Sequence, residues 1–340
     1  MKRKIIFFHA FLAGICIYGA FNCNDPTKDK SPSENKIAVI FDTDANNEVD
    51  DQHALAYLLL SGHTFQVEAI TVNATSDGGD IEQHFAEAER VLKLCDAPED
   101  LPLLKGANGS FEEIQPQLGN EDFDGAEAVH FIIESAKAHV EDTLTLIAVG
   151  KLTNVALAVA KDPSIIPHIR LVWLGSNYPE PGEYNLENDI PSMNYLLKSG
   201  IEFDMVVVRY GKPSGTDAIR VVKGGINREM PGLGPHIEEP VTGRHGGSFS
   251  NFGDYSIDLF AHTEYYGRPP SRALFDMTAV AIVKNPDWAE KTLIPGPTMV
   301  DNQWVEQVDN PRQISLWENF DKDEILANFY TSLKYYQVIE

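Results

Sequence analysis

Short apolar runs alternate with longer segments of helical period along the chain from residue 37 onward. Apolar runs that are rich in β-branched side chains predict buried strands. Such runs lie at residues 37–41, 67–72, 144–149, 169–174 and 204–208. Apolar residues at helical spacing predict helices at residues 54–59, 80–94, 124–140, 152–160, 255–266, 271–284 and from 323 onward. The alternation predicts an α/β fold with an open, mostly parallel, Rossmann-like sheet that is flanked by helices.

Three segments interrupt this alternation. Residues 96–123 are rich in Pro, Gly and Asn and are expected to be irregular. Residues 211–253 are rich in glycine and lack an apolar period, which predicts an elaborated loop or a lid near the site rather than a second core domain. We expect a hairpin around residues 295–297, followed by a short strand at 314–316. Residues 36–340 are therefore expected to form one α/β domain with a glycine-rich insertion around 211–253.

The first residues of the chain have the composition of an export signal. Residues 1–22 combine a basic start with an apolar stretch that is too short for a stable membrane span, which predicts a signal peptide. Residues 23–35 are polar and predict a flexible linker. Cys23 stands where bacterial lipoproteins carry a lipid-modified cysteine, although the two residues before it are larger than usual. We expect a bacterial protein that is exported, either periplasmic or a membrane-anchored lipoprotein attached only through Cys23.

Charge and cysteine content narrow the range of partners. The formal net charge is −24, so a nucleic-acid backbone or an anionic membrane surface is excluded as a partner on electrostatic grounds. Cys95 is the one cysteine within residues 36–340, and it lies in a predicted amphipathic helix. It therefore forms no intramolecular disulfide in the domain, and we expect a packed thiol.

Acidic residues are concentrated where the first predicted strand ends. The strand leads into DTDANNEVDDQH, residues 42–53, which carries the carboxylates Asp42, Asp44, Glu48, Asp50 and Asp51. One interpretation is a solvated loop whose Asp and Asn residues cap the next helix. Carboxylates this close repel one another, and each resists ionisation unless a cation or hydrogen-bond donors offset the repulsion. At the carboxyl end of a buried strand, a site for a hard cation is the favoured interpretation.

Other polar residues follow later strands and are expected at the same edge of the sheet. Residues 149–154 form a tight turn after the third strand, and Asn177 and residues 183–185 follow the fourth. Asp276 lies in the predicted helix 271–284, which is apolar on nearly all sides. A buried carboxylate without a partner costs several kcal/mol or stays protonated. An ion pair with an arginine or a position near solvent would explain Asp276, and so would a metal shared with the first-strand aspartates.

Four ordered motifs resemble the inosine-uridine preferring nucleoside hydrolases. The apolar strand that ends in DTD and precedes a DD pair is similar to the metal signature of that family. The family's Gly-x-Leu-Thr-Asn turn, its ribose-binding segment and its last metal-ligand helix are similar to residues 149–158, to Asn177 with residues 183–185, and to residues 275–281. The resemblance spans about residues 36–285 and implies the nucleoside hydrolase fold.

The resemblance implies a metal-dependent hydrolase acting on a small-molecule nucleoside or related riboside. Its ligand set would hold Ca²⁺ through Asp44, a bidentate Asp51, the Val149 carbonyl and Asp276. Asp44 would also deprotonate the water that attacks the anomeric carbon, so that the N-glycosidic bond is cleaved by metal-activated water. A homo-oligomer is compatible with the resemblance.

The resemblance also assigns residues to the sugar. Asp50 would accept a hydrogen bond from the ribose 2′-hydroxyl, and Asn177, Glu183 and Asn185 would bind the other hydroxyls. Asp42 would orient the loop without touching the metal.

Three departures from the family pattern concern the loop and the leaving group. Five residues rather than three separate Asp44 from the Asp pair, which places Glu48 in an enlarged loop. Thr75 stands where the family often has Asn, and Phe275 stands where some members have a leaving-group His. A phenyl ring can stack on a base but cannot protonate it. The missing acid would have to be another residue, for which the candidates are His245, Arg244 and Tyr184.

Two alternative functions are compatible with parts of the sequence. Phe275 and the enlarged loop are compatible with an exported nucleoside- or sugar-binding protein without turnover. A haloacid-dehalogenase-type phosphatase also has Asp-x-Asp after its first strand, and residues 253–258 (GDYSID) match its late acidic motif. That motif should follow an apolar strand, which is absent here, so Asp254 is predicted to be a helix N-cap instead.

Overall fold

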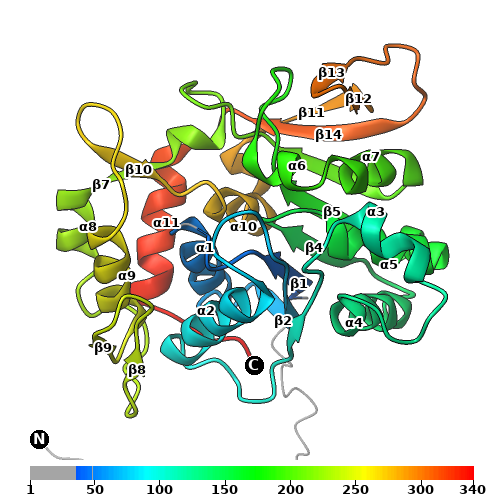
Figure 1. Ribbon diagram of the computed structural model, residues 1–340. Coiled ribbons are helices and arrows are strands. Elements are labelled where there is room, and N and C mark those ends of the chain that lie inside the picture. Colours follow the sequence, from blue (N-terminus) through cyan, green and yellow to red (C-terminus); the bar gives the residue numbers. More distant parts are fainter. Residues whose placement is uncertain (1–35, 48) are drawn as a thin grey trace, which may run out of the picture. The chain divides into compact units, whose positions relative to one another are not determined.

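An eight-stranded sheet organises the chain in the computed structural model, which describes residues 36–47 and 49–340 (Figure 1). The strand order is β11-β14-β6-β5-β4-β1-β2-β3. The strands are β1 (Ile37–Thr43), β2 (Phe65–Val72), β3 (Leu103–Lys105), β4 (Leu144–Ala148), β5 (Ile169–Leu174), β6 (Glu202–Val206), β11 (Glu290–Pro295) and β14 (Gln313–Glu318). Every pair is parallel except β11 with β14. This confirms the predicted open, mostly parallel α/β fold.

Helices cover both faces of the sheet because its central strands are apolar on both sides. In β1, Val39 and Phe41 belong to one hydrophobic core, and Ala38 and Ile40 to the other. The first core is closed by α1 (Asp50–Leu59), α2 (Ile81–Leu94), α9 (Phe252–Ala261), α10 (Met277–Lys284) and α11 (Lys322–Lys334). The second is closed by α3 (Phe111–Ile114), α4 (Ala126–Ala138), α5 (Thr153–Lys161) and α7 (Ile190–Ser199).

Shorter elements decorate the sheet. They are α6 (Tyr184–Asn188), α8 (Lys223–Glu229), the paired strands β7 (Arg220–Val222) and β10 (Ser271–Ala273), β8 (Val241–Thr242) and β9 (Ser248–Phe249), β12 (Thr298–Val300) and β13 (Gln303–Val305), and 3-10 turns at Gln115–Gln117, Pro163–His168, Thr216–Ala218 and Pro286–Trp288. The glycine-rich segment 211–253 thus folds into β7, α8 and the hairpin β8–β9 rather than into a featureless loop.

Three predictions of local structure were wrong. Residues 96–123 were expected to be irregular but contain the edge strand β3 and the short helix α3. The helix α7 was not predicted. The predicted helix 271–284 is a strand, β10, followed by a turn and by α10 from Met277. Pairing with β7 overrides helical spacing in its first residues. Asp276 therefore lies at the start of α10 and not in the middle of a helix.

Two predictions near the C-terminal half were also wrong in detail. Residues 295–297 do not close a hairpin, because β11 pairs with β14 and the hairpin is β12–β13. Asn251, not Asp254, is the N-cap of α9, since its side chain accepts a hydrogen bond from the Asp254 amide. Asp254 lies in the first turn and accepts a hydrogen bond from the Gly232 amide at 3.0 Å.

The strand order creates a switch point between β1 and β4. From β1 the chain builds outward to β2 and β3 on one side, and from β4 to β5 and β6 on the other. Loops after β1 and β4 therefore diverge and leave a crevice at the carboxyl edge of the sheet, where ligands bind in such folds. The acidic loop after β1 and the turn after β4 lie at this crevice.

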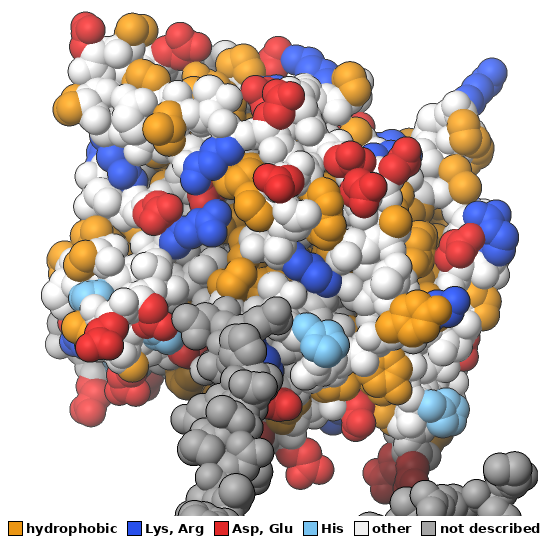
Figure 2. Space-filling model, turned by 180° about the vertical axis from the view of Figure 1, so that it is seen from behind, with side chains coloured by type: hydrophobic (Ala, Val, Ile, Leu, Met, Phe, Trp, Pro, Cys, Tyr) orange, Lys and Arg blue, Asp and Glu red, His pale blue; other side chains and the backbone are white. Residues whose placement is uncertain are grey.

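Several predictions fall on residues outside the described part of the chain. They are the signal peptide at 1–22, the linker at 23–35, Cys23 as a lipid anchor, and the place of Glu48. Within the described residues, none of the helices combines the length and the apolar character that crossing a membrane requires. Cys95 is buried and reduced, and burial raises the pKa of its thiol, as expected for a packing residue. The face shown in Figure 2 intersperses acidic and basic side chains.

Candidate active site

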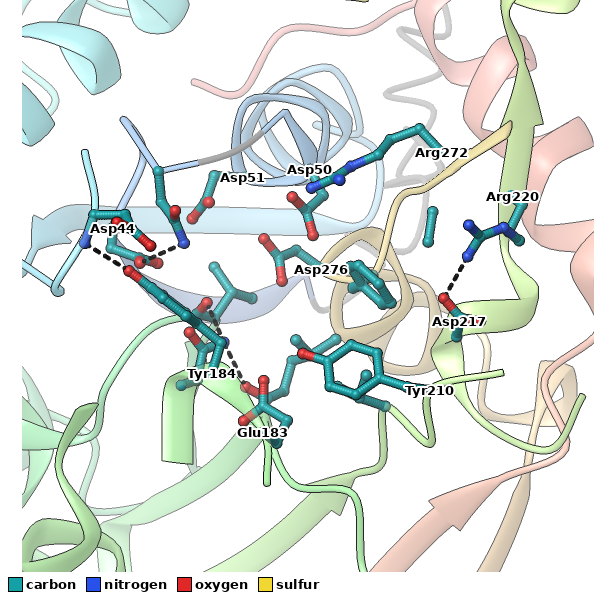
Figure 3. Close-up of a pocket in the computed structure, with 18 of the residues that line it drawn as sticks. Asp44, Asp50, Asp51, Glu183, Tyr184, Tyr210, Asp217, Arg220, Arg272 and Asp276 are labelled. Atoms are coloured by element: carbon teal, nitrogen blue, oxygen red, sulfur yellow. Dashed lines mark hydrogen bonds and ion pairs between the residues drawn. The ribbon is translucent and has the colours of Figure 1, made fainter. Parts of the chain in front are cut away.

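A cavity of about 440 Å³ lies at the switch point, at the carboxyl ends of β1 and β4. Its deep wall is acidic, with Asp44, Asp50, Asp51 and Asp276 pointing into a common space (Figure 3). All four are at most 5% exposed. The segments that supply them are the loop after β1, the first residues of α1 and the start of α10. Residues far apart in the sequence therefore meet at one place.

Asp44 is held by hydrogen-bond donors from two segments. Its Oδ2 accepts from the Thr75 hydroxyl at 2.5 Å and from the Asn47 amide at 3.3 Å. Gly150 lies close on the other side, where a Cβ would come within 3.0 Å of Asp44 Oδ1. The Thr75 hydroxyl thus fixes the position of Asp44, and glycine at 150 leaves the space that Asp44 needs.

Asp42 is buried but does not line the cavity. Its carboxylate accepts hydrogen bonds from Thr71 at 2.6 Å, Asn73 at 2.6 Å and Asn154 at 2.7 Å. These bonds tie β1 to β2 and to α5. The arrangement agrees with the prediction that Asp42 orients the loop.

Asp50, Asp51 and Asp276 form a compact group of carboxylates. One oxygen from each lies within 4.8 Å of the others. Asp51 Oδ1 accepts a hydrogen bond from the Thr43 hydroxyl at 2.5 Å, and the charge of Asp44 adds to the effect of burial in raising the pKa of Asp51. Burial raises the pKa of Asp50, and the nearby backbone amides of Phe275 and Asp276 oppose that rise. The structure thus adds Asp50 to the oxygens around this point, beside the three aspartates predicted to share an ion.

Burial raises the pKa of every acidic group on this wall. It raises the pKa of Asp50 to about 7 and that of Glu183 to about 7, and it holds the pKa of Asp51 and Asp276 well above the usual range. Charges on neighbouring carboxylates add to the effect. Within residues 36–47 and 49–340, none of these groups forms an ion pair with a lysine or arginine. A site that is rich in carboxylate oxygens and lacks a positive side chain to balance them fits a hard divalent cation.

The Val149 carbonyl is directed by Asn185. The Asn185 side-chain amide donates to the Val149 carbonyl at 2.8 Å and to the Leu174 carbonyl at 3.1 Å. Both Val149 and Asn185 line the cavity. Because a carbonyl oxygen has a second lone pair, Val149 can accept from Asn185 and still face a ligand.

Glu183 and Asn177 lie in different surroundings. Glu183 lines the cavity, and its Oε2 accepts from the backbone amides of Ser176 and Leu186, both at 2.9 Å. Asn177 is not among the residues that line the cavity. Its side chain donates to the Gly182 carbonyl and accepts from the Tyr210 amide at 3.1 Å. In the structure, Asn177 therefore connects the loop at Gly182 with the loop at Tyr210 and lies outside the cavity lining, whereas the prediction places it on the sugar.

The outer part of the cavity is aromatic. Phe275 and Tyr210 both line it, and their rings meet edge to face with centroids 5.8 Å apart. Tyr184 also lines it, and its hydroxyl accepts from the Asp77 amide at 2.8 Å. Of the three residues weighed as a leaving-group acid, only Tyr184 borders the cavity, whereas Arg244 and His245 are not among its lining residues.

Two arginines at the cavity were not predicted. Arg220 lies on β7 and forms an ion pair with Asp217, and Arg272 lies on β10 with its guanidinium 5.8 Å from the Tyr266 ring centre (Figure 3). The antiparallel pairing of β7 with β10 brings them together. Local sequence patterns do not predict this pairing, because about 50 residues, which include the rest of the insertion and α9, separate the two strands.

His53 closes the apolar side of α1 directly behind the site. It is fully buried, its Nε2 lies 2.7 Å from the Ser256 hydroxyl, and its ring contacts Phe252, Phe260 and Phe329. Burial lowers its pKa to about 4. The imidazole is therefore neutral in the folded protein over the physiological range.

We expect His53 to make the folded protein less stable as pH falls. Between the unfolded pKa of about 6.5 and the folded value only the unfolded state binds the proton, so about 2 kcal/mol of stability is lost by roughly pH 5. Chemical unfolding of metal-saturated wild type and His53→Asn, measured across this range, should show the steeper decline in the wild type. The exposed His63→Asn serves as the control, and parallel curves for wild type and His53→Asn would refute the assignment.

The family model of inosine-uridine preferring nucleoside hydrolases matches residues 39–327. The chain belongs to this family. Over 191 residues it is 26% identical to the non-specific ribonucleoside hydrolase RihC of Klebsiella pneumoniae (strain 342), a match that covers 50% of this chain and 60% of the relative. Over 161 residues it is 29% identical to the pyrimidine-specific ribonucleoside hydrolase RihB of Shigella flexneri, with 47% of each chain covered. The matches thus span less than two thirds of these curated relatives.

Solved structures of the family have the same fold. A plant nucleoside hydrolase superposes with a TM-score of 0.69 at 16% identity, covering 88% of this chain and 99% of that structure. The inosine-uridine preferring nucleoside hydrolase of Bacillus anthracis superposes with a TM-score of 0.62 at 18% identity over the same shares of the two chains. These likenesses confirm the fold predicted from the sequence, and the family model confirms the resemblance to the family.

Proposed function

We propose that the protein is a Ca²⁺-dependent hydrolase that cleaves the N-glycosidic bond of a ribonucleoside or a related riboside. The observation that carries the proposal is the group of buried carboxylates at the cavity, whose pKa values are raised by burial and by one another. Membership of the nucleoside hydrolase family supports the reaction class.

The donor set fits Ca²⁺ better than a softer metal. Asp44, Asp51, Asp276 and the Val149 carbonyl offer only oxygen atoms, and Asp50 adds one more within the group. Oxygen ligands with no histidine or cysteine among them suit Ca²⁺ or Mg²⁺, and the larger Ca²⁺ tolerates bidentate carboxylates and irregular geometry. When bound, the cation would lower the pKa of a water molecule and orient the sugar hydroxyls.

The acidic residues of the cavity would activate the water and bind the sugar. Asp44 would take the proton from the attacking water, and its bonds from Thr75 and Asn47 hold it for that role. Asp50 and Glu183 line the same space and would accept hydrogen bonds from the ribose hydroxyls. Negative charge around the sugar would also favour an oxocarbenium-like transition state.

The aromatic side of the cavity would bind the aglycone. Phe275 and Tyr210 present adjoining ring surfaces on which a flat base can stack. Phe275 carries no proton to give, so a hydroxyl such as that of Tyr184 or Tyr210 would assist the departing base. Burial raises the pKa of both tyrosines, which keeps them protonated as donors.

A panel of nucleosides with and without chelator tests the proposal. We expect release of free base from purine or pyrimidine ribonucleosides, loss of turnover in chelator and recovery on addition of Ca²⁺. The matched 2′-deoxyribonucleosides should react far more slowly, since they lack the hydroxyl that Asp50 and the cation would bind. Base release and bound ligand are measured separately by chromatography and calorimetry.

Two other outcomes would contradict the proposal. Binding of ribonucleosides without turnover across the panel would indicate a binding protein. Release of phosphate from a phosphoester would indicate a phosphatase. The structure offers no support for the latter, because the GDYSID segment lies on α9 after a loop, and neither Asp254 nor Asp258 lines the cavity.

A further inference from the structure

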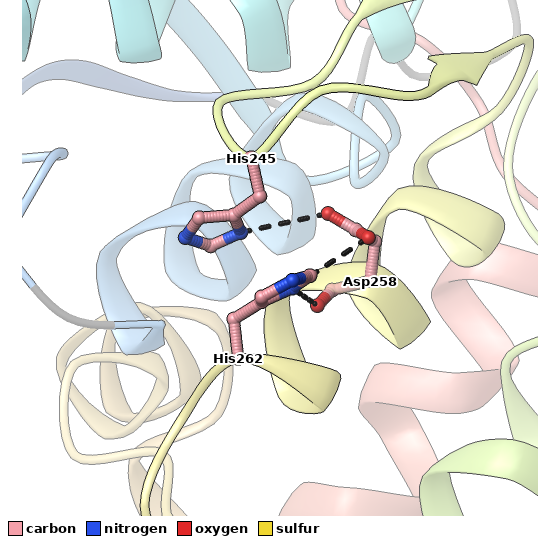
Figure 4. A group of neighbouring side chains, drawn as sticks. All are labelled: His245, Asp258 and His262. Carbon is pink, nitrogen blue, oxygen red and sulfur yellow. Dashed lines mark hydrogen bonds and ion pairs between the residues drawn. The ribbon is translucent and has the colours of Figure 1, made fainter.

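A second cluster of metal-ligating side chains lies away from the catalytic cavity. His245 from the turn between β8 and β9 faces Asp258 and His262 at the end of α9 (Figure 4). His245 Nδ1 is 3.5 Å from Asp258 Oδ2, and His262 Nδ1 is 3.6 Å from Asp258 Oδ1. One ligand atom from each residue lies within 4.8 Å of the others.

Local structure explains why the three side chains converge. Asp258 and His262 are four residues apart, so they project from the same face of α9. His245 is delivered by a tight turn in which the Gly246 amide donates to the Gly243 carbonyl at 2.9 Å. Gly246 and Gly247 have φ values of 89° and 79°, which residues other than glycine rarely adopt. The glycines thus turn the hairpin so that His245 lies over α9.

The protein alone leaves this cluster incompletely satisfied. Asp258 Oδ2 is buried, and no described residue donates a hydrogen bond to it. The two imidazole rings stack with centroids 4.1 Å apart and planes inclined by 29°. Burial, the Arg244 charge and His262 lower the pKa of His245. A buried carboxylate oxygen that meets one imidazole nitrogen only at 3.5 Å, with a second imidazole beside it, is an environment that suits a cation with nitrogen and oxygen ligands.

We propose that His245, Asp258 and His262 bind a divalent transition metal of the Zn²⁺ class, at a site distinct from the catalytic one. With metal–ligand distances of about 2.1 Å, tetrahedral ligands are separated by roughly 3.4 Å, close to the two separations observed here. Two imidazoles and one carboxylate suit Zn²⁺, whereas the all-oxygen catalytic wall suits Ca²⁺. Water would complete the coordination on the exposed side of His262.

Metal binding at this cluster would replace existing contacts. Arg244 Nε lies 3.3 Å from His245 Nε2, and His262 Nδ1 lies 2.9 Å from the Asp258 carbonyl. In the metal-free protein these contacts direct protons toward the positions that a metal would occupy. Binding through Nδ1 therefore requires each neutral ring to carry its proton on Nε2 instead, so that His245 can no longer accept from Arg244.

Arg244 connects this cluster to the catalytic loop. Its guanidinium donates to the Asn46 carbonyl at 3.2 Å, two residues after Asp44. Asn46 in turn donates from its side chain to the Gly78 carbonyl at 2.6 Å. A metal that fastens the β8–β9 hairpin to α9 would therefore stabilise the outer support of the loop that carries Asp44.

Calorimetric titration with Zn²⁺ tests the proposal in the presence of saturating Ca²⁺, which occupies the catalytic oxygens. We expect one Zn²⁺ per chain, and Co²⁺ in its place should give the visible absorption of a tetrahedral site. His245→Gln and His262→Gln should each weaken Zn²⁺ binding by more than about tenfold, the loss that even an outer-shell change produces. His63→Gln, which removes an exposed histidine elsewhere, should bind as the wild type does.

Two results would overturn the proposal. One is the absence of stoichiometric Zn²⁺ binding by the wild type. The other is unchanged binding in both histidine variants, which would place the ion elsewhere in the chain. His262 is about half exposed, so His262→Gln is expected to fold even if a change at the more buried Asp258 is not tolerated. Thermal unfolding without metal checks that each variant is folded.

Discussion

Asp44→Asn is expected to lower kcat for riboside hydrolysis by about 10³-fold at saturating Ca²⁺. The amide cannot accept the proton of the attacking water, yet it has nearly the same shape and can still accept the hydrogen bond from Thr75. Steady-state kinetics with a ribonucleoside that the wild type cleaves, at several Ca²⁺ concentrations, separate loss of the base from weaker cation binding. The variant should remain folded, because removing a buried charge relieves repulsion within the acidic wall.

The exposed Asp122→Asn is the matched control and should retain wild-type kinetics. Thr75→Val offers a graded comparison, since it removes only the donor 2.5 Å from Asp44 and should reduce kcat by a smaller factor. If Asp44→Asn kept more than a tenth of the wild-type kcat at saturating Ca²⁺, Asp44 would not be the general base.

Asp276→Asn is expected to weaken Ca²⁺ binding by at least about 100-fold and at the same time to stabilise the metal-free protein. The carboxylate is buried beside Asp50 and Asp51, which raises its pKa well above the usual range. Replacing one member of such a group by a neutral side chain of equal size should raise the free energy of unfolding of the metal-free protein by on the order of 1–3 kcal/mol. Calorimetry measures the affinity, and thermal unfolding in chelator measures the stability.

The sign of the pH dependence gives a second test of the same variant. The folded state keeps protons on carboxyls whose pKa is raised, such as Asp50 at about 7, whereas the unfolded chain has released them above about pH 4. Stability of the metal-free protein due to these groups therefore falls as pH rises through 7, and the fall should be shallower in Asp276→Asn. The exposed Asp287→Asn should follow the wild type. A metal-free Asp276→Asn that unfolds at a lower temperature, with unchanged Ca²⁺ affinity, would contradict the assignment.

Local patterns in the sequence predicted much of the candidate site. Asp44, Asp50 and Asp51 follow a buried strand directly, so their place at the sheet edge depends only on β1 and on the start of α1. Val149 follows β4 in the same way. The structure finds all four at the cavity. These positions could be predicted because neighbours in the chain stay neighbours in the fold.

Predictions failed where the outcome depended on contacts between distant segments. The residues before Asp276 have helical spacing but form β10, because β7 supplies a partner strand. The spacing of Asn177 matches a sugar-binding segment, and its contact with the sugar stays a prediction. What the sequence did not indicate is that the Asn177 side chain accepts a hydrogen bond from the amide of Tyr210, in a loop 33 residues away. The direction of a loop side chain depends on the residues that pack against it, and the local sequence does not predict which residues these are.

The sequence by itself determined the alternation of strands and helices, the acidic turn after the first strand and the family to which the chain belongs. These features depend on apolar periodicity and short motifs, whose physical effect acts over a few residues. Only the tertiary structure decided that Arg220 and Arg272 border the cavity and that Tyr210 lies against Phe275. It also decided that His245 meets Asp258 and His262. Such contacts close long loops of chain, so they form only when the packing of the whole domain repays the entropy of bringing distant segments together.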